Sequence, residues 1–240
     1  MKAVVLAGGK GTRLAPYTTI FPKPLVPIGE RPILEIIIRQ LVRQGFNEVL
    51  LSIGHLGELI EAYFQNGHRN IPGLKLDYFR ELQPLGTAGS LAVIPGLDET
   101  FLVMNGDILT NLDYRSFFKY HKANEALCTI ASYVKSVKID LGVIKADENN
   151  RLYDYVEKPD LEYTVSMGVY AFRRQALDFI PKDGYFDFPD LIKTLLKEGQ
   201  KVLRYPFSGH WLDIGRPDDY EKAIEEFDKR KTEFLGGSGK

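Results

Sequence analysis

Cysteine and net charge are the two quantities that this sequence has least of. Its single cysteine, Cys128, cannot form an internal disulfide, and the apolar residues around it predict a small core residue rather than a nucleophile. Lysine and arginine number 31 against 32 aspartates and glutamates, which gives a formal charge of −1. The chain therefore has no broad positive field to attract nucleic acid or an anionic membrane, and any phosphate must be recognised by local groups.

Long hydrophobic runs are also absent. Only five apolar residues separate Met1 and Lys2 from the first glycines, which is too few for a signal-peptide core. Nowhere do about 18 apolar residues follow one another, as a membrane-spanning helix requires. The 240 residues are 44% hydrophobic and 26% charged, a composition typical of a globular protein with its own core. We therefore expect a cytoplasmic protein that binds neither membranes nor nucleic acid.

The first half alternates short β-branched runs with helical periodicity. This alternation predicts an α/β fold with a mostly parallel sheet flanked by helices. A helix opened by Pro32 is expected to end near Gly45. The other expected helices are 58–64 and 87–94, and the expected strands are 3–7, 48–53, 76–79 and 101–105.

The second half is less regular and richer in strands. Candidate strands are 128–133, 142–145, 152–157 and 167–172. A final amphipathic helix has Tyr220 and Phe227 on one face, and Asp218 and Asp219 are expected to cap its start. Because no Ser/Gly/Pro-rich linker divides the chain, we expect one domain at 1–235 and a flexible tail at 236–240.

A glycine loop, Gly8-Gly9-Lys10-Gly11, directly follows the first expected strand. Glycines at the carboxyl edge of a parallel sheet allow backbone N–H groups to approach phosphate oxygens, although a tight turn alone would also use them. A dinucleotide fingerprint needs a further glycine where Leu14 stands. A Walker A loop needs Gly-Lys-Ser/Thr, and the other Gly-Lys pair, Gly239-Lys240, ends the chain.

The residues from Gly8 to Thr18, followed by Pro22-Lys23-Pro24, resemble the signature of the sugar-1-phosphate nucleotidyltransferases. Further matching segments follow in order at 85–89, 105–107, 156–159, 167–170 and 211–215. The resemblance covers about residues 1–228 and is nearest to catalytic domains of the mannose-1-phosphate guanylyltransferase type. It implies a Rossmann-like sheet with an inserted strand-rich sugar-binding subdomain. Residues 1–113 would mainly bind nucleotide and 114–235 mainly the sugar.

The reaction implied by this resemblance joins two anions. A phosphate oxygen of a sugar 1-phosphate attacks the α-phosphorus of an NTP, and pyrophosphate leaves. Such a nucleophile is already deprotonated, so no general base is needed. In agreement, the four histidines show no metal-ligand spacing and no nucleophile motif: His55, His68, His121 and His210.

The resemblance also assigns roles to single residues. Arg13 would hold the β- and γ-phosphates and Lys23 the α-phosphate, whereas an average lysine or arginine is a solvated surface cation. Asp107 and Asp213 would bind Mg²⁺, a hard cation that takes one or two carboxylates together with phosphate oxygens. Lys158 would bind the sugar phosphate and complete the catalytic set of Arg13, Lys23, Asp107 and Lys158.

Two groups of contact residues complete the expected site. For the nucleotide they are Leu6, Ala7, Gly8, Gly9, Gly11, Thr12, Arg13, Lys23, Gln83, Gly86, Thr87, Gly106 and Asp107. For the sugar phosphate they are Gly142, Glu157, Lys158, Ser166 and Gly168. Glu157 would bind a sugar hydroxyl, while Ser166 stands where the family commonly has asparagine. The structural alternatives are a surface salt bridge at 157–158 and strand bulges at the two glycines.

The nucleotide base is predicted to be guanine. The segment 85–89 resembles that of guanylyltransferases, and the Gln83 amide together with backbone groups at Gly86 and Thr87 can pair with a purine edge. The same amide fits a pyrimidine, so CTP, UTP and dTTP stay open, as do a non-catalytic NDP-sugar-binding subunit and a nucleotide-dependent kinase. The substrates would be an NTP and a sugar 1-phosphate of unidentified sugar, and a homo-oligomer is compatible with the sequence.

Overall fold

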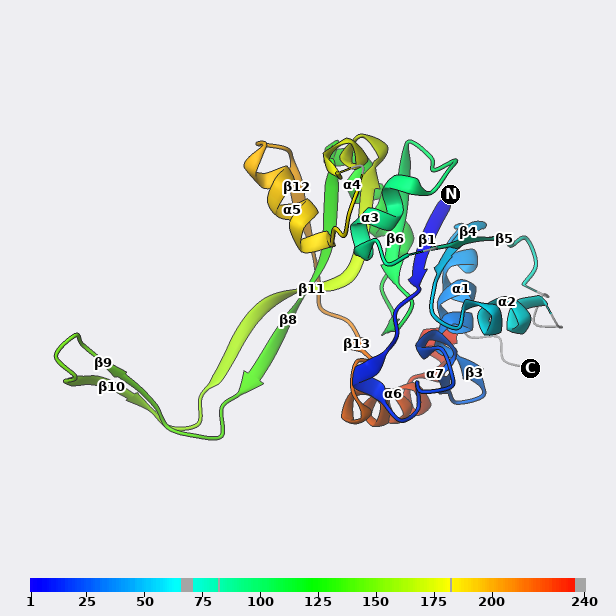
Figure 1. The fold of residues 1–240 in the computed structure, drawn as a ribbon. Helices are drawn as coiled ribbons and strands as arrows, with labels where there is room; N and C mark the ends of the chain where they lie inside the picture. Colours follow the sequence, from blue (N-terminus) through cyan, green and yellow to red (C-terminus); the bar gives the residue numbers. More distant parts are fainter. Residues whose placement is uncertain (66–70, 82, 182, 236–240) are drawn as a thin grey trace.

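A seven-stranded sheet forms the centre of the protein, with the strand order β12-β8-β11-β6-β1-β4-β5 (Figure 1). The computed structural model describes residues 1–65, 71–81, 83–181 and 183–235. The expected tail at 236–240, with Gly239-Lys240, and the histidine at position 68 lie outside these residues.

The strands expected in the first half form one side of this sheet. β6 (Thr100–Asn105), β1 (Lys2–Ala7), β4 (Glu48–Ile53) and β5 (Lys75–Arg80) pair in parallel. α1 (Ile33–Arg43), α2 (Gly57–Gln65) and α3 (Gly86–Val93) connect them. Pro32 directly precedes α1, and Gly45, with φ of 90°, follows its end. The predicted α/β fold is confirmed here.

The strands of the second half extend the same sheet. β11 (Asp160–Arg173) pairs antiparallel with both β6 and β8 (Cys128–Lys138), and β8 pairs in parallel with β12 (Val202–Phe207). Strand-rich structure was expected here, but the two long strands are built differently along their length. Their inner parts lie in the main sheet, and their outer parts leave it as a two-stranded ribbon.

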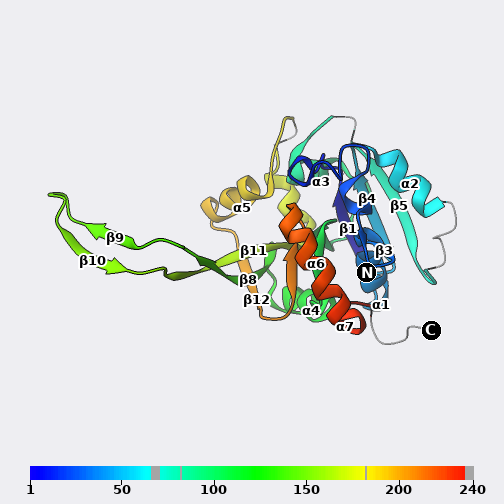
Figure 2. The same cartoon turned by 90° about the horizontal axis from the view of Figure 1, so that it is seen from below.

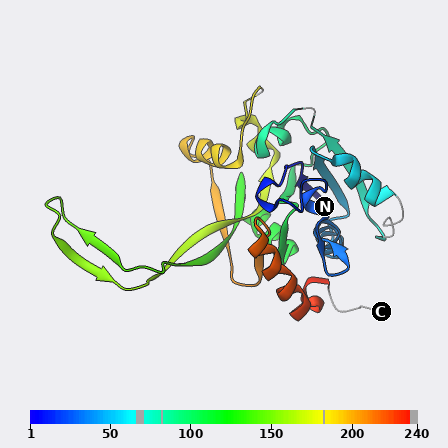
Figure 3. The same cartoon turned by 60° about the horizontal axis from the view of Figure 1, so that its bottom comes forward.

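This ribbon carries a hairpin at its far end. β9 (Val143–Ala146) and β10 (Leu152–Val156) pair with each other in a separate antiparallel sheet. We call residues 134–165 the arm. All three cartoon views show it reaching away from the rest of the protein (Figures 1, 2 and 3).

Helices cover both faces of the sheet. One hydrophobic cluster joins it to α1, α2, α4 (Tyr114–Asn124), α6 (Pro217–Lys229) and α7 (Lys231–Leu235). The other joins it to α3, α5 (Phe188–Lys197) and the short helix η3 (Arg174–Phe179), and it includes the buried Cys128 as predicted. Within the described part of the chain, no helix has the length and apolar character needed to cross a bilayer.

Two short pairings shape the region after the main strands. β7 (Ile108–Thr110) pairs with β13 (Trp211–Asp213), and β2 (Pro27–Ile28) with β3 (Arg31–Pro32). The first pairing places Asp213 opposite Ile108.

The expected capping of the last long helix is wrong: Arg216 is the N-cap of α6 and makes no side-chain cap. Asp218 and Asp219 lie in its first turn, where carboxylates still favour the positive end of the helix dipole.

Candidate active site

Three parallel strands end side by side at one edge of the sheet, and each is followed by a glycine. A Cβ atom at Gly54 would lie 2.9 Å from the carbonyl oxygen of Gly8, and one at Gly106 2.9 Å from that of Leu6. The Gly106 N–H donates a 2.9 Å hydrogen bond to this Leu6 oxygen. The segments after β1, β4 and β6 can therefore pack backbone against backbone, at the sheet edge where α/β proteins bind ligands.

The glycine loop after β1 has one open and one crowded position. A Cβ atom at Gly9 would meet nothing within 4 Å, so its backbone faces free space. Gly11 has φ of 62°, and a Cβ atom there would lie 3.0 Å from the Cβ of Lys23. The hydroxyl of Thr18 donates to the Gly11 carbonyl over 2.7 Å. Gly11 thus serves the turn and the close approach of Lys23, while Gly9 presents backbone to a ligand.

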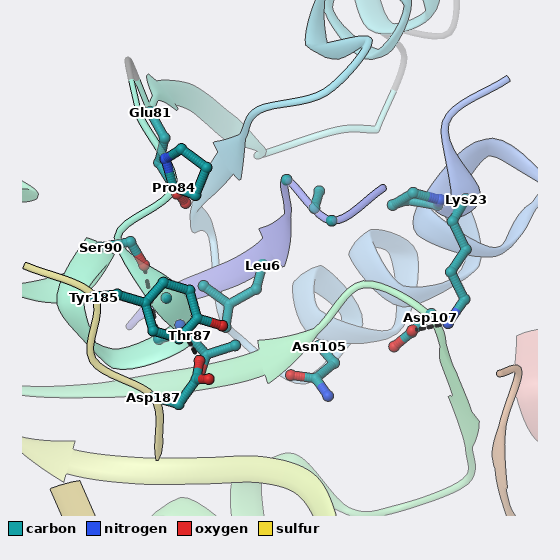
Figure 4. A pocket seen from close by; sticks show the side chains of 15 residues that line it. Leu6, Lys23, Glu81, Pro84, Thr87, Ser90, Asn105, Asp107, Tyr185 and Asp187 are labelled. Atoms are coloured by element: carbon teal, nitrogen blue, oxygen red, sulfur yellow. Dashed lines mark hydrogen bonds and ion pairs between the residues drawn. The ribbon is translucent and has the colours of Figure 1, made fainter. Parts of the chain in front are cut away.

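Lys23 and Asp107 form an ion pair across this edge of the sheet. Lys23 comes from the short helix η2 (Lys23–Leu25) between Pro22 and Pro24, and its side chain is 10% exposed. Asp107 follows β6, and Figure 4 shows the lysine reaching down to it. Lys23 contacts only Oδ2 of Asp107. The other carboxylate oxygen, Oδ1, is buried and has no hydrogen-bond partner. The carboxylate therefore keeps a free, inward-facing oxygen.

Asp213 lies next to Asp107 because β13 pairs with β7. The N–H of Ile214 donates a 3.1 Å hydrogen bond to the carbonyl of Asp107. Desolvation and the Asp107 carboxylate raise the pKa of Asp213, although Lys23 and Arg13 act in the opposite direction and the side chain still reaches solvent. A carboxylate whose pKa is raised by a neighbouring carboxylate lies at a site that favours a cation.

Arg13 lies near Asp213. It belongs to the short helix η1 (Thr12–Leu14), and its guanidinium lies beside Gly215, where an added Cβ would be 3.6 Å from Nη1. Its charge acts on Asp213. Arg13 is therefore close to the second carboxylate but is not among the described residues that line the pocket.

An open pocket of about 310 Å³ lies at the carboxyl ends of β1 and β6 (Figure 4). Its lining consists of Leu6, Ala7, Gly8, Gly9, Lys23, Pro24, Glu81, Pro84, Gly86, Thr87, Ser90, Asn105, Asp107, Tyr185 and Asp187. Among these described residues a single cation, Lys23, faces three carboxylates. A strongly anionic ligand in this pocket would therefore need further positive charge, from a metal ion or from residues outside the lining.

The start of α3 is fixed by a segment about 100 residues further along the chain. The Asp187 carboxylate accepts from the Thr87 N–H at 2.8 Å and from its hydroxyl at 2.9 Å. The Phe186 carbonyl accepts from the N–H groups of Ala88 and Gly89. At Gly86 an added Cβ would lie 2.5 Å from that same carbonyl. The Thr87 N–H is thus bonded within the protein, and the contact of a purine edge with other backbone groups around Gly8, Gly86 and Thr87 stays a prediction.

The remaining nucleotide residues lie around the pocket. Thr12 lines a second recess of about 230 Å³ with Lys10 and His55, on the other side of the glycine loop. Gln83 is exposed, next to the lining residue Pro84. Gly106 holds the turn between β6 and Asp107. The pocket itself unites eight of the expected nucleotide contacts: Leu6, Ala7, Gly8, Gly9, Lys23, Gly86, Thr87 and Asp107.

Two of the expected sugar residues lie where β11 bulges. The pairing of β11 with β8 shifts register between Ser166 and Tyr170. Gly168 has φ of 72°, and a Cβ atom there would lie 2.7 Å from Nδ2 of the pocket residue Asn105. The Ser166 hydroxyl donates to the Tyr170 hydroxyl and accepts from the Gly168 N–H. Gly168 therefore lies at a strand bulge, which was the structural alternative to sugar binding for this glycine. The Ser166 hydroxyl forms its hydrogen bonds within the protein.

Glu157, Lys158 and Gly142 all lie on the arm. Lys158 is exposed, and Glu157 accepts a 2.8 Å hydrogen bond from Tyr155. A Cβ atom at Gly142 would lie 2.2 Å from that tyrosine's hydroxyl oxygen, so this glycine makes room for the ring. At about 3.3 Å per residue, the extended run from Lys158 to Gly168 spans roughly 30 Å. The predicted grouping of these residues with the pocket is therefore not seen within one chain.

Several lining residues were not expected from the sequence. Asn105 lies in the matching segment 105–107, and its place at the end of an apolar strand is a signal that the sequence contains. Tyr185 donates a hydrogen bond to Asp187, and together with Thr87 it lowers the pKa of Asp187 against the effect of burial. Glu81 and Ser90 gave no signal, because chain folding alone brings them to the pocket.

The donor set at this edge limits which metal ions fit. In the described ranges no group of three or more His, Cys, Asp or Glu side chains is close enough to hold a metal by itself. Asp107 and Asp213 supply two hard oxygen ligands, one of them buried and unpartnered. Such a site suits Mg²⁺, which usually keeps several waters and takes one or two carboxylates plus substrate phosphates.

The chain is similar to known proteins over most of its length. The sequence profile described as nucleotidyl transferase matches residues 2–230. UTP–glucose-1-phosphate uridylyltransferase of Synechocystis sp. is 35% identical over 246 residues, covering 93% of this chain and 62% of that protein. Mannose-1-phosphate guanylyltransferase of Mycobacterium tuberculosis is 32% identical over 227 residues, covering 92% and 63%. The chain thus spans under two thirds of these curated relatives.

A solved structure resembles the whole fold. The crystal structure of HddC from Yersinia pseudotuberculosis, complexed with GMP-PN, superimposes with a TM-score of 0.71 at 27% sequence identity. The match covers 94% of this chain and 99% of that one.

Proposed function

This chain belongs to the nucleotidyl transferase family, and from this premise we propose that it transfers a nucleotidyl group from an NTP to a sugar 1-phosphate. An oxygen of the sugar phosphate forms a bond to the α-phosphorus, the bond between the α-phosphorus and the β-phosphate breaks, and pyrophosphate leaves. The products are an NDP-sugar and pyrophosphate. Both curated relatives carry names of this kind, one for UTP with glucose 1-phosphate and one for guanylyl transfer to mannose 1-phosphate.

The observation that supports this proposal most is the joining of Lys23, Asp107 and Asp213 beside an open glycine loop. In this reaction Lys23 neutralises charge that develops at the α-phosphate, and the backbone around Gly9 approaches the triphosphate. Arg13, which lies near Asp213, binds phosphate oxygens. Because neither substrate needs a base, catalysis consists of positioning and charge neutralisation.

We assign Mg²⁺ to Asp107 and Asp213. The free Oδ1 of Asp107 supports this assignment, since a buried carboxylate oxygen without a partner suits a cation ligand. When bound, the ion neutralises the phosphate oxygens and holds them in line. Lys23 forms an ion pair with Asp107 and so orients its carboxylate for this role.

GTP is our proposed nucleotide. The guanylyltransferase relative and the HddC complex with GMP-PN favour it. The uridylyltransferase relative supports a pyrimidine alternative, UTP first, with CTP and dTTP behind it. Gln83, exposed at the pocket margin beside Pro84, is the side chain on which we place base recognition. Its amide donates to guanine O6 and accepts from N1–H or N2–H₂.

The test is a comparison of kcat/KM for pyrophosphate release. GTP, UTP, CTP, dTTP and ATP are each paired with glucose 1-phosphate and mannose 1-phosphate in Mg²⁺. We expect GTP to lead by more than tenfold, because a mispaired base leaves polar groups unsatisfied at about 1–3 kcal/mol each. Gln83→Leu should shrink this lead, whereas Gln65→Leu, at an exposed glutamine on α2, should not. A pyrimidine nucleotide in first place refutes the assignment of GTP.

The same assay separates the other classes of protein. A kinase would release NDP rather than pyrophosphate, and a regulatory subunit would bind NDP-sugar without turnover. The sugar is identified by the 1-phosphate with the highest kcat/KM.

Gly9 provides a prediction that separates binding from folding. Gly9→Ala should leave the melting temperature nearly unchanged, since its methyl group meets no protein atom within 4 Å. It should raise the KM for NTP about tenfold or more, because the methyl group occupies space needed for close backbone approach to phosphate. Steady-state kinetics and thermal melts check both halves. An unchanged KM would show that the loop is only a turn.

A further inference from the structure

We propose that the arm of one chain completes the active site of a second copy of the same chain, in a dimer with exchanged arms. Lys158 of each subunit would then bind the sugar phosphate in the pocket of its partner. The inference rests on the proposed function. It also concerns oligomeric state, which the sequence left open.

The arm exposes an unusual amount of apolar surface. Of the 16 large hydrophobic residues exposed in the described chain, nine lie on the arm. They are Val134, Val137, Leu141, Ile144, Leu152, Tyr153, Tyr155, Val156 and Tyr163. Leu152 and Tyr153, near the tip, are 61% and 69% exposed. Exposed apolar side chains gathered on one segment in this number are typical of a contact with another protein.

The area on the arm is sufficient for a stable contact. At roughly 150–200 Å² for each large side chain, nine of them about half exposed present on the order of 800 Å². A standard interface buries about 800 Å² on each partner. Exchange of two arms between two copies would use this surface twice and would close the assembly by two-fold symmetry.

Charge indicates where the partner's arm would lie. The pocket lining has Lys23 against Glu81, Asp107 and Asp187, so it lacks cations for two phosphate-bearing substrates. Lys158 is an exposed cation beyond reach of its own pocket. The lysine and the pocket are therefore complementary.

Closure of the arm onto its own pocket is less compatible with the structure. Pairing between β11 and β8 runs without a register shift from Asp160 opposite Lys138 to Ser166 opposite Ser132. Folding back over roughly 30 Å would break this ladder of backbone hydrogen bonds or fold it at the bulge near Gly168. Contact with a second copy needs no such change, because the extended arm can bind there with its strand pairing intact.

Complementation between two inactive variants tests the proposal. Lys23→Ala damages the pocket and leaves the arm intact, whereas Lys158→Ala does the reverse. Each alone should lose most kcat/KM for the sugar 1-phosphate. Co-expressed with different tags and purified as a mixed dimer, they should recover about half of wild-type activity, because one of the two shared sites is intact.

Two controls accompany this experiment. The mixed dimer of Lys23→Ala with the double variant Lys23→Ala/Lys158→Ala has no intact pocket and should stay inactive. Lys145→Ala changes an arm lysine that pairs with Asp154 and should keep wild-type activity. Recovery no greater than the sum of the two homodimers overturns the proposal and indicates a site built within one chain.

Sedimentation provides a readout that does not need activity. The wild-type protein should be a dimer at micromolar concentration, and Leu152→Glu should shift it to monomer. Ile20→Glu, at an apolar residue 79% exposed outside the arm, should not. A wild-type monomer overturns the proposal even if the enzyme is active. A dimer that releases no pyrophosphate with any substrate pair would instead refute the proposed function while leaving the arm contact standing.

Discussion

Asp107→Asn is expected to lower kcat for pyrophosphate release by roughly a hundredfold or more. The amide is nearly isosteric, and its oxygen still accepts a hydrogen bond from Lys23. It removes the negative charge and places an N–H₂ group, which cannot bind a cation, where the free Oδ1 now lies. Loss of activity would therefore arise from lost metal binding and not from altered packing.

Metal titration distinguishes this cause from others. Calorimetry with Mg²⁺ and Mn²⁺ should show weakened binding to Asp107→Asn, and raised metal concentration should recover part of kcat. Asp228→Asn, at an exposed carboxylate on α6, serves as the matched control and should behave as wild type. Turnover near wild type in Mg²⁺ for the Asp107 variant would refute the metal assignment.

The sheet around this site was largely predictable from sequence. β1, β4 and β6 are short apolar runs with glycine directly after them, and buried parallel strands have this pattern. Helix α1 was fixed by Pro32 at its start and Gly45 after its end. These signals are local, so no tertiary information was needed to read them.

The arm was not predictable in the same way. The expected strands 142–145 and 152–157 correspond to β9 and β10 at its end. The expected strands 128–133 and 167–172, however, cover only the inner parts of β8 and β11, because their outer parts have no buried face to impose a period of two. Both faces of a free two-stranded ribbon meet solvent, and so polar and apolar residues such as Lys135, Val137 and Tyr163 mix along it. Its length became visible only through pairing of distant segments.

In the site, too, local sequence patterns predicted some features, whereas others depend on residues that are far apart in the chain. Lys23 and Asp107 come from separate motifs whose order along the chain was informative, and the structure pairs them. The bonds of Thr87 to Asp187 join residues 100 positions apart, and no local pattern reveals them. One of the backbone groups in the region predicted to meet the base, the Thr87 N–H, is thus bonded within the protein.

Lys23→Ala should reduce kcat/KM by at least a hundredfold, since about 3 kcal/mol of charge stabilisation is lost at the α-phosphate. Metal affinity, which Asp107→Asn is expected to lower, should not fall in Lys23→Ala. Without the lysine, the carboxylates of Asp107 and Asp213 repel each other with no nearby partner for Asp107. A divalent cation relieves this repulsion, so affinity for Mg²⁺ should be retained or increased.

Loss of the Lys23–Asp107 ion pair should also lower the stability of the fold. Removing one partner of this largely buried ion pair should cost about 1–3 kcal/mol in free energy of unfolding without metal. Saturating Mg²⁺ should raise the melting temperature of Lys23→Ala more than that of wild type, because ligand binding stabilises the folded state that holds it. Lys10→Ala, at an exposed lysine of the same glycine loop, is the matched control and should change neither quantity. If kcat/KM falls less than tenfold, or if Mg²⁺ stabilises both proteins equally, Lys23 is not the partner that sets the charge of this metal site.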